Sequence, residues 1–155
     1  MIGSVSQLKN EMVDRAAIQD CLCRYARAVD RLDEDLLRTV YWPEAIDNHL
    51  VFSGNVEEFI AWAFPKMRAM NQNFHMLGNT LIRLDGATAK VETYFYGIQC
   101  AEIAGRVRDT VAAGRYLDRF ERRTIRVAFR TLRSPSLGVC DGLFYRSSSR
   151  RAVAR

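Results

Sequence analysis

The sequence predicts an α+β domain in which three N-terminal helices precede a set of long antiparallel strands. Up to about residue 70, apolar side chains recur at the three- and four-residue spacing of helices. From residue 74 onward the period changes to two residues, which is typical of strands. The length of 155 residues suits one domain with a substantial core.

The first helix is expected from about Ser6 to Asp30. Its apolar residues Ile18, Leu22, Tyr25 and Val29 follow the i, i+4, i+7, i+11 spacing, which places them on one face of a helix. Charged side chains occupy the remaining face. The pattern therefore predicts a helix with one buried stripe.

Two shorter helices and a strand complete the N-terminal half. A helix is expected over residues 33–40, followed by a short strand over 44–52 that Ser53-Gly54 closes as a turn. Asn55 is the expected N-cap of a third helix over residues 56–70. We expect these elements to form the helical layer of the domain.

The second half of the chain is predicted to be a sheet. Strands are expected over 74–84 and 87–100, joined by a tight turn at Asp85-Gly86, because this dipeptide tolerates the positive φ angles of a two-residue loop. A loop is expected over 104–113, before two further strands between residues 115 and 132. Both faces of the strand over 87–100 carry large side chains, so one face is a candidate wall of a cavity.

The net charge is +5, and the positive excess is concentrated at the end of the chain. From Arg122 onward there are nine arginines and one acidic residue, Asp141. A nucleic-acid patch and a solvated tail are the two interpretations. We favour the solvated tail, and no nucleic-acid partner, because the segment lacks the interleaved aromatic residues of a stacking platform. We expect one domain over residues 1–145 and a basic, flexible tail over 146–155.

Several kinds of site are disfavoured by the sequence. No apolar run approaches the ~20 residues of a membrane span, and no secretory signal is evident. The four cysteines contain no Cys-x-x-Cys pair, which argues against a zinc site or a disulfide framework. His49 and His75 lack the spacing of a chelating pair, and no phosphate-binding loop or nucleophile elbow is present. We expect a cytosolic protein without a bound metal.

Asp30 and His75 are the leading candidates for chemistry. Asp30 ends the apolar stripe of the first helix, and His75 lies at the entry to a long strand. A carboxylate that fixes the tautomer of an imidazole creates a general base that works near neutral pH. Structural roles are the alternatives: Asp30 could terminate its helix, and His75 could be a core histidine bonded to the backbone.

The order of several short motifs resembles that of the SnoaL-like family of the nuclear transport factor 2-like superfamily. The motifs span about residues 15 to 131 and are Arg15-Ala-Ala-Ile-Gln-Asp20, Tyr25 to Asp30, Tyr41-Trp-Pro-Glu-Ala45, Phe52-Ser-Gly54, His75 to Asn79 and Gly114-Arg-Tyr-Leu-Asp-Arg-Phe-Glu-Arg-Arg123. The resemblance implies a cystatin-like cone, in which a strongly curved mixed or antiparallel sheet wraps round the helices and encloses a pocket. It also implies a cofactor-free site and a homo-oligomer, either a dimer or a trimer.

Relatives in this family include hexachlorocyclohexane dehydrochlorinase, scytalone dehydratase and bile acid 7α-dehydratase. By resemblance, Asp30 and His75 match a catalytic dyad, Tyr25 matches a site tyrosine, and Arg130 matches an arginine on a late strand. Five residues at 100° each place Tyr25 about 140° round the helix from Asp30, so a core role is an equal alternative for it. An exposed surface position is the alternative for Arg130.

Six apolar residues are candidates to line the pocket, although most residues of this kind belong to a core. They are Trp42, Phe59, Trp62, Phe64, Met67 and Phe95. The chain departs from the family pattern after Arg123, where Thr124-Ile-Arg-Val replaces the usual Asp-Gly turn. The last strand and the closure of the pocket are therefore the parts that the resemblance fixes least.

The leading hypothesis is a cofactor-independent dehydratase, dehydrohalogenase or double-bond isomerase for an apolar cyclic molecule such as a steroid, polyketide or aromatic catabolite. His75 is expected to remove a proton while Asp30 holds the ring, and Tyr25 or Arg130 is expected to assist the oxygen or leaving group. The alternative is a non-catalytic ligand-binding module or the small (beta) subunit of a ring-hydroxylating dioxygenase. The separation of His75 from Asp30, and an open apolar pocket around them, discriminate between the two.

Overall fold

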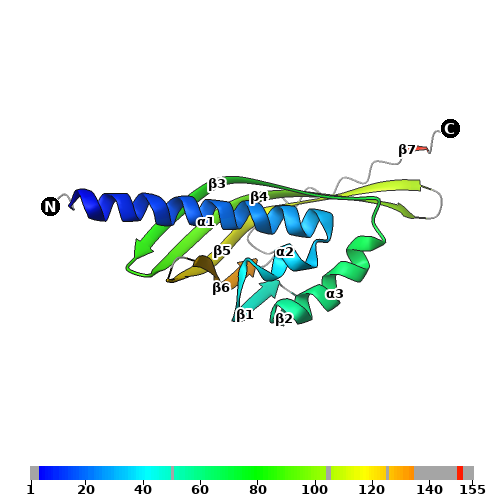
Figure 1. Ribbon diagram of the computed structural model, residues 1–155. Coiled ribbons are helices and arrows are strands. Elements are labelled where there is room, and N and C mark those ends of the chain that lie inside the picture. Colours follow the sequence, from blue (N-terminus) through cyan, green and yellow to red (C-terminus); the bar gives the residue numbers. More distant parts are fainter. Residues whose placement is uncertain (1–3, 50, 104–105, 125, 135–149, 152–155) are drawn as a thin grey trace.

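The computed structural model describes residues 4–49, 51–103, 106–124, 126–134 and 150–151 (Figure 1). Its helices are α1 (Val5–Arg31), α2 (Glu34–Arg38) and α3 (Val56–Arg68). Its strands are β1 (Tyr41–His49), β2 (Phe52–Gly54), β3 (Gln72–Asp85), β4 (Thr88–Ile103), β5 (Arg106–Arg123), β6 (Arg126–Ser134) and β7 (Arg150–Arg151).

The strands form one mixed sheet in the order β2-β1-β6-β5-β4-β3, and β7 pairs with β5. The β1–β6 pair is parallel, whereas the other pairs are antiparallel. Helix α1 lies along β3 and β6, and α3 packs against β1 and β2 (Figure 1). This architecture confirms the predicted α+β class, with three helices packed on a mixed sheet.

Helix α1 forms as its apolar pattern predicts. Ser4 caps its N-terminus, and the stripe of Ile18, Leu22, Tyr25 and Val29 is buried against the sheet. The helix stops at Leu32, whose backbone adopts a left-handed conformation with φ of 56° and donates its N–H to carbonyls of the last turn. The helix therefore delivers its final residues to the sheet at a fixed position.

Caps also fix the start of the other two helices. The Asp33 side chain accepts the Leu36 N–H at the start of α2. Asn55 and Glu58 form a reciprocal capping box at the start of α3, and a cap of this kind stabilises a helix by about 1 kcal/mol. The predicted N-cap of the third helix is confirmed.

Two predicted irregular segments belong to the sheet instead. Residues 106–113, expected as a loop, are part of β5 and continue the β4–β5 pairing as far as the Ile103–Arg106 pair. Ser53 and Gly54, expected as a turn, pair with Asn48 and Asp47 as part of β2. In both places, backbone pairing with a neighbouring strand outweighs the turn and loop preferences of the residues.

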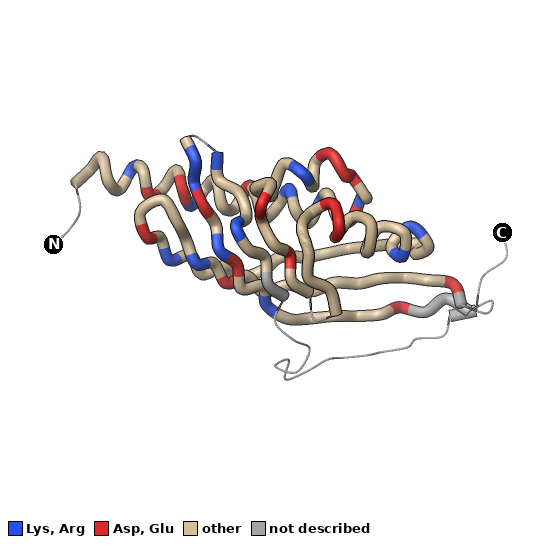
Figure 2. Tube along the Cα trace, turned by 90° about the horizontal axis from the view of Figure 1, so that it is seen from below, with Lys and Arg blue, Asp and Glu red and all other residues tan. Residues whose placement is uncertain are grey.

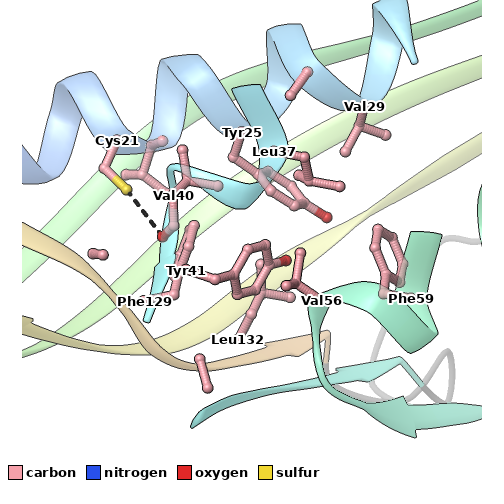
Figure 3. Packing of buried hydrophobic residues seen from close by; sticks show 14 of the residues in the cluster. Cys21, Tyr25, Val29, Leu37, Val40, Tyr41, Val56, Phe59, Phe129 and Leu132 are labelled. Carbon is pink, nitrogen blue, oxygen red and sulfur yellow. Dashed lines mark hydrogen bonds between the residues drawn. The ribbon is translucent and has the colours of Figure 1, made fainter. Parts of the chain in front are cut away.

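The core is centred on aromatic rings between α1 and the strands (Figure 3). Tyr25 meets Tyr41, Tyr116 and Phe129 in edge-to-face geometry, with ring centroids 5.7 to 6.4 Å apart. Each such pair contributes about 0.5–1.5 kcal/mol beyond its buried area. This cluster fixes the position of α1 over the inner face of the sheet.

Cys21 belongs to the same core. Its thiol lies 3.6 Å from the Val40 carbonyl (Figure 3), and burial raises the pKa of Cys21 to about 12. A buried thiol with so high a pKa is chemically inert near neutral pH. Cys21 is therefore a packing residue, and Cys23 and Cys100 are also free thiols in the described structure.

The hairpin between β5 and β6 departs from an ideal turn. Arg123 pairs with Arg126 across it, and Thr124 has a φ of 55°. A β-branched residue rarely adopts this left-handed conformation, because its side chain clashes with the backbone. The position that carries Asp-Gly in the resembling family is therefore built here with local strain.

Charged residues of both signs are interspersed over the described chain (Figure 2). Ion pairs join Arg38 to Glu57, Arg68 to Glu34 and Arg122 to Asp14. The predicted tail over 146–155 lies outside the described residues, apart from the β7 residues opposite β5. None of the described helices has the length and apolar character needed to cross a membrane.

Candidate active site

A cavity of about 310 Å³ opens between α1, α3 and the inner face of the sheet. Its volume lies at the lower end of the range of small-molecule pockets, about 300–1,000 Å³. Most of its wall is apolar or aromatic, and two histidines and two tyrosines face it. The lining residues are Tyr25, Val29, His49, Phe59, Trp62, Ala63, Lys66, Met67, Met70, His75, Phe95, Gln99 and Tyr116.

Asp30 and His75 meet at this cavity through two hydrogen bonds. The Asp30 Oδ1 lies 2.6 Å from His75 Nδ1, and Asp30 Oδ2 accepts the His75 backbone N–H at 3.0 Å. The two side chains are 19% and 16% exposed. One carboxylate therefore holds both the backbone and the ring of the histidine in place.

This geometry selects the tautomer of His75. Because a carboxylate only accepts hydrogen bonds, Nδ1 carries the hydrogen and Nε2 is left to accept a proton. Gly97 pairs with His75 on the neighbouring strand. A Cβ at this position would lie 3.6 Å from Nε2, so the glycine leaves room beside the basic nitrogen.

Tyr25 also faces the cavity, despite its angular offset from Asp30 on α1. Its ring is buried and lies edge-to-face against Tyr116. Burial, followed by the nearby Tyr116 and Asp47, raises the pKa of Tyr25 well above its usual value. Tyr25 therefore combines the core role and the cavity position, and its hydroxyl stays neutral.

Four of the six predicted lining residues are in the wall: Phe59, Trp62, Met67 and Phe95. The prediction was wrong for Trp42 and Phe64. Trp42 is buried on β1, where its ring lies between the guanidinium groups of Arg123 and Arg126, at 4.5 and 4.7 Å, and its Nε1 donates to the Glu121 carbonyl. Phe64 is fully buried in the core and does not line the cavity.

Arg130 does not join the site. It lies on β6 with 47% of its side chain exposed, and its guanidinium contacts Glu44 at 2.9 Å and Glu121 at 3.6 Å. Glu44 and Glu121 sit beside Arg123 as well. The expected help of Arg130 at the leaving group is corrected: the arginine belongs to a surface ion-pair network.

A second histidine–aspartate pair, which the sequence did not predict, lies on β1. His49 Nε2 lies 2.9 Å from Asp47 Oδ1, although neither atom has an aligned hydrogen bond within the described structure. Asp47 is fully buried and its Oδ2 accepts the Tyr41 hydroxyl at 2.6 Å. The Asp-x-His spacing on an expected strand was the available signal, because residues i and i+2 share one face.

No metal site accompanies these residues in the described part of the chain, where no three His, Cys, Asp or Glu side chains gather as ligands. The polar groups in the wall are instead suited to proton transfer. Imidazole and phenol groups face a mostly apolar space, where electrostatic interactions are stronger than in water.

Comparison with known proteins agrees with this description. Residues 10–133 match the family model of the SnoaL-like domain. No curated protein gives a significant sequence match. A hexachlorocyclohexane dehydrochlorinase, LinA type 2, is similar with a TM-score of 0.70 and 14% identity over 92% of this chain and 93% of that one.

Two similar structures come from Novosphingobium aromaticivorans. A candidate scytalone dehydratase has a TM-score of 0.71 and 14% identity over 83% of this chain and 89% of that one. A candidate aromatic ring hydroxylase has a TM-score of 0.66 and 24% identity over 88% of this chain and 93% of that one. At these identities the similarity establishes the fold, and the resemblance read from the short motifs is confirmed.

Proposed function

This chain belongs to the SnoaL-like domain family, and we propose that it is a cofactor-independent lyase or isomerase that acts on an apolar cyclic small molecule. The observation that supports this most is the Asp30–His75 pair, held by two hydrogen bonds at the wall of an apolar cavity. The reaction is an elimination or a migration of a double bond, started by removal of a proton from carbon.

His75 is the general base in this proposal. Its Nε2 takes the proton, and the Asp30 carboxylate stabilises the imidazolium that forms and keeps the ring in one orientation. Proton transfer by a positioned group of this kind accelerates a reaction by about 10²–10⁴-fold. No cofactor is needed for this step.

The rest of the cavity supports a ring-shaped substrate. Phe95 stacks on Tyr116 with ring centroids 4.4 Å apart, and Phe59, Trp62 and Met67 supply further apolar wall. A flat or puckered carbon ring fits such walls better than a charged or extended molecule. The neutral Tyr25 hydroxyl is the hydrogen-bond donor that we propose for a substrate oxygen.

The proposal is tested with a β-chloro cyclohexanone, in which removal of a proton beside the carbonyl and loss of chloride give a cyclohexenone. Formation of the enone is followed by its ultraviolet absorbance. We expect the wild-type protein to accelerate the reaction and His75→Ala to lower kcat/KM by about 10²–10⁴-fold.

Arg130→Ala is the matched control, because Arg130 lies outside the cavity. It should eliminate chloride at the wild-type rate. A His75→Ala protein as fast as wild type, or a wild-type protein no faster than buffer, would count against a base-driven lyase.

A second candidate function is favoured by the outer face of the sheet. Large apolar side chains are exposed there, on strands β3 to β5: Phe74, Met76, Tyr94, Tyr96 and Leu117. Such a surface suits a subunit of an assembly, either a homo-oligomer or the beta subunit of a ring-hydroxylating dioxygenase. An inactive protein whose mass in solution exceeds that of one chain would support this non-catalytic role.

A further inference from the structure

We infer that His49, oriented by Asp47, is a second acid–base residue in the same cavity, and that the site therefore acts on rings whose departing or polarised oxygen must receive a proton. The inference rests on the proposed function, because it supplies the acid that complements the base His75. It assigns a role to a pair that lies outside the Asp30–His75 dyad.

His49 and His75 lie on strands far apart in the sheet but face the same cavity. His49 is on β1 and His75 on β3, and β6, β5 and β4 separate these two strands in the sheet. Both imidazoles nevertheless line one cavity, because the sheet curves round it. A ring bound between them would be reached from two sides.

The side chains around His49 restrain its ring. Its ring stacks on Phe59 with centroids 5.1 Å apart and an interplanar angle of 20°, and one fifth of the side chain is exposed. The stack restrains the ring plane and Asp47 Oδ1 lies 2.9 Å from Nε2, so Nδ1 is the nitrogen that we assign to a bound molecule. His49 is thus restrained as a catalytic acid must be.

Burial of the Asp47 side chain in the core is unfavourable in free energy, because a carboxylate loses its hydration there. The side chain is fully buried, yet the described structure gives Oδ1 no aligned hydrogen bond, and His49 Nε2 beside it has none either. Buried polar atoms are nearly always satisfied in folded proteins, and each exception calls for an explanation, of which a catalytic role is one. A positioning role toward His49 explains why the carboxylate stands here, with Tyr41 holding its other oxygen.

The proposed elimination balances with these two histidines. His75 takes the proton from the carbon beside a carbonyl, the electrons of that C–H bond form the new C=C bond, and the bond to the leaving oxygen breaks. The His49 imidazolium gives its proton to that oxygen, and water departs. His75 ends protonated and His49 neutral, and proton exchange with solvent restores both.

The same arrangement discriminates between leaving groups. Chloride departs without a proton, whereas hydroxide is too basic to depart unless it is protonated as the bond breaks. A site with only the Asp30–His75 pair suits the first kind of substrate. The additional His49–Asp47 pair is useful only for the second, which indicates an oxygenated ring that loses water or enolises.

The test compares a β-hydroxy and a β-chloro cyclohexanone, which give the same cyclohexenone by losing water or hydrogen chloride. We expect His49→Gln to lower kcat/KM for the hydroxy ketone by about 10²-fold and for the chloro ketone by less than about twofold. Asp47→Asn should give the same selectivity with a smaller loss, since it keeps an acceptor for Tyr41. Asn48→Ala, an exposed position between the two, is the matched control and should change neither rate.

Nitrogen NMR of the rings provides a readout independent of turnover, because the chain has only two histidines. The ring signals that disappear in His49→Gln belong to His49. Asp47→Asn should shift these signals and leave those of His75 unchanged. Thermal unfolding of each variant shows whether it is folded. If His49→Gln is unfolded, Asp47→Asn replaces it in the comparison of the two ketones.

Each outcome bears on one of the two proposals. Loss of the chloro reaction in His75→Ala, together with equal or no effects of His49→Gln on the two ketones, would overturn the role of His49 and leave the base in place. A wild-type protein that eliminates neither ketone would overturn the proposed function, and this inference with it. A selective loss of the hydroxy reaction supports both.

Discussion

The two histidine–aspartate pairs of this protein are built in different ways. Asp30 and His75 lie 45 residues apart, on α1 and β3, and both side chains are partly exposed. Asp47 and His49 are two residues apart on β1, and the carboxylate of this pair is fully buried. The first pair depends on how a helix docks on the sheet, whereas the second depends on one strand.

This difference teaches what each carboxylate can do. Asp30 makes one hydrogen bond to the ring and one to the backbone of His75. In our proposal it fixes the orientation of the ring and stabilises the positive charge that the ring gains when it takes a proton. Asp47 is fixed by Tyr41 and lies among the aromatic residues of the core. The first pair is organised as a base with a supporting ion, and the second as an acid with a rigid holder.

Asp30→Asn should have the largest effect on this comparison. The amide cannot stabilise the imidazolium as a carboxylate does, so elimination of chloride should fall by about 10²-fold or more. The measurement is kcat/KM for the β-chloro cyclohexanone. Asp47→Asn should eliminate chloride at close to the wild-type rate under the same conditions. Equal losses in the two variants would contradict the different roles assigned to the two carboxylates.

Alkaline pH should destabilise the tyrosine-rich core around Asp47. Burial raises the pKa of Tyr25, Tyr41 and Tyr116 in the folded protein, whereas the unfolded chain ionises near pH 10. Stability contributed by these groups is therefore fully present below about pH 10 and is lost as pH rises above it.

Chemical denaturation at pH 7, 9 and 11, together with tyrosinate absorbance, checks this expectation. Unfolding free energy should be level between the first two and lower at the third. Buried tyrosines that ionise without any loss of structure would contradict it.

Tyr41→Phe should destabilise the fold by about 1–3 kcal/mol, because it leaves a carboxylate oxygen of Asp47 buried without a donor. Urea denaturation measures the difference. Tyr94→Phe, which removes a hydroxyl from an exposed ring, is the control and should be neutral. If Tyr41→Phe is as stable as wild type, Asp47 has another partner and the contrast between the carboxylates weakens.

Thr124→Gly should have the smallest effect and should leave both pairs untouched. Glycine adopts a φ of 55° without a steric clash, so the substitution is expected to stabilise the protein by about 1 kcal/mol. Thermal unfolding detects the change. Destabilisation, or any loss of elimination activity, would show that the turn between β5 and β6 influences the cavity.

Local patterns predicted much of this structure. The spacing of Ile18, Leu22, Tyr25 and Val29 indicates the buried face of α1, and Asn55 marks the start of α3, because both signals act within a few residues. The long β4–β5 pairing was missed over residues 106–113, since pairing energy between strands is not visible in one segment.

The site shows the same division. The family resemblance indicated Asp30 and His75, whereas their distance depends on the docking of α1. Arg130 was wrongly predicted to face the site, because its ion-pair partners Glu44 and Glu121 come from β1 and β5, the strands on either side of β6. This strand order cannot be read from the sequence around Arg130. The His49–Asp47 pair could have been found from alternation along the predicted strand over 44–52, which contains both residues on one face.

The most direct test of the central claim is rescue of His75→Ala by added imidazole. The cavity left by the missing ring lies beside Asp30 and the substrate, so a free imidazole can occupy it and act as the base. We expect the slow elimination of chloride by His75→Ala to rise with imidazole concentration until it saturates, with no such rise for wild type. A His75→Ala protein that reacts at the wild-type rate without imidazole would contradict the assignment of His75 as the general base.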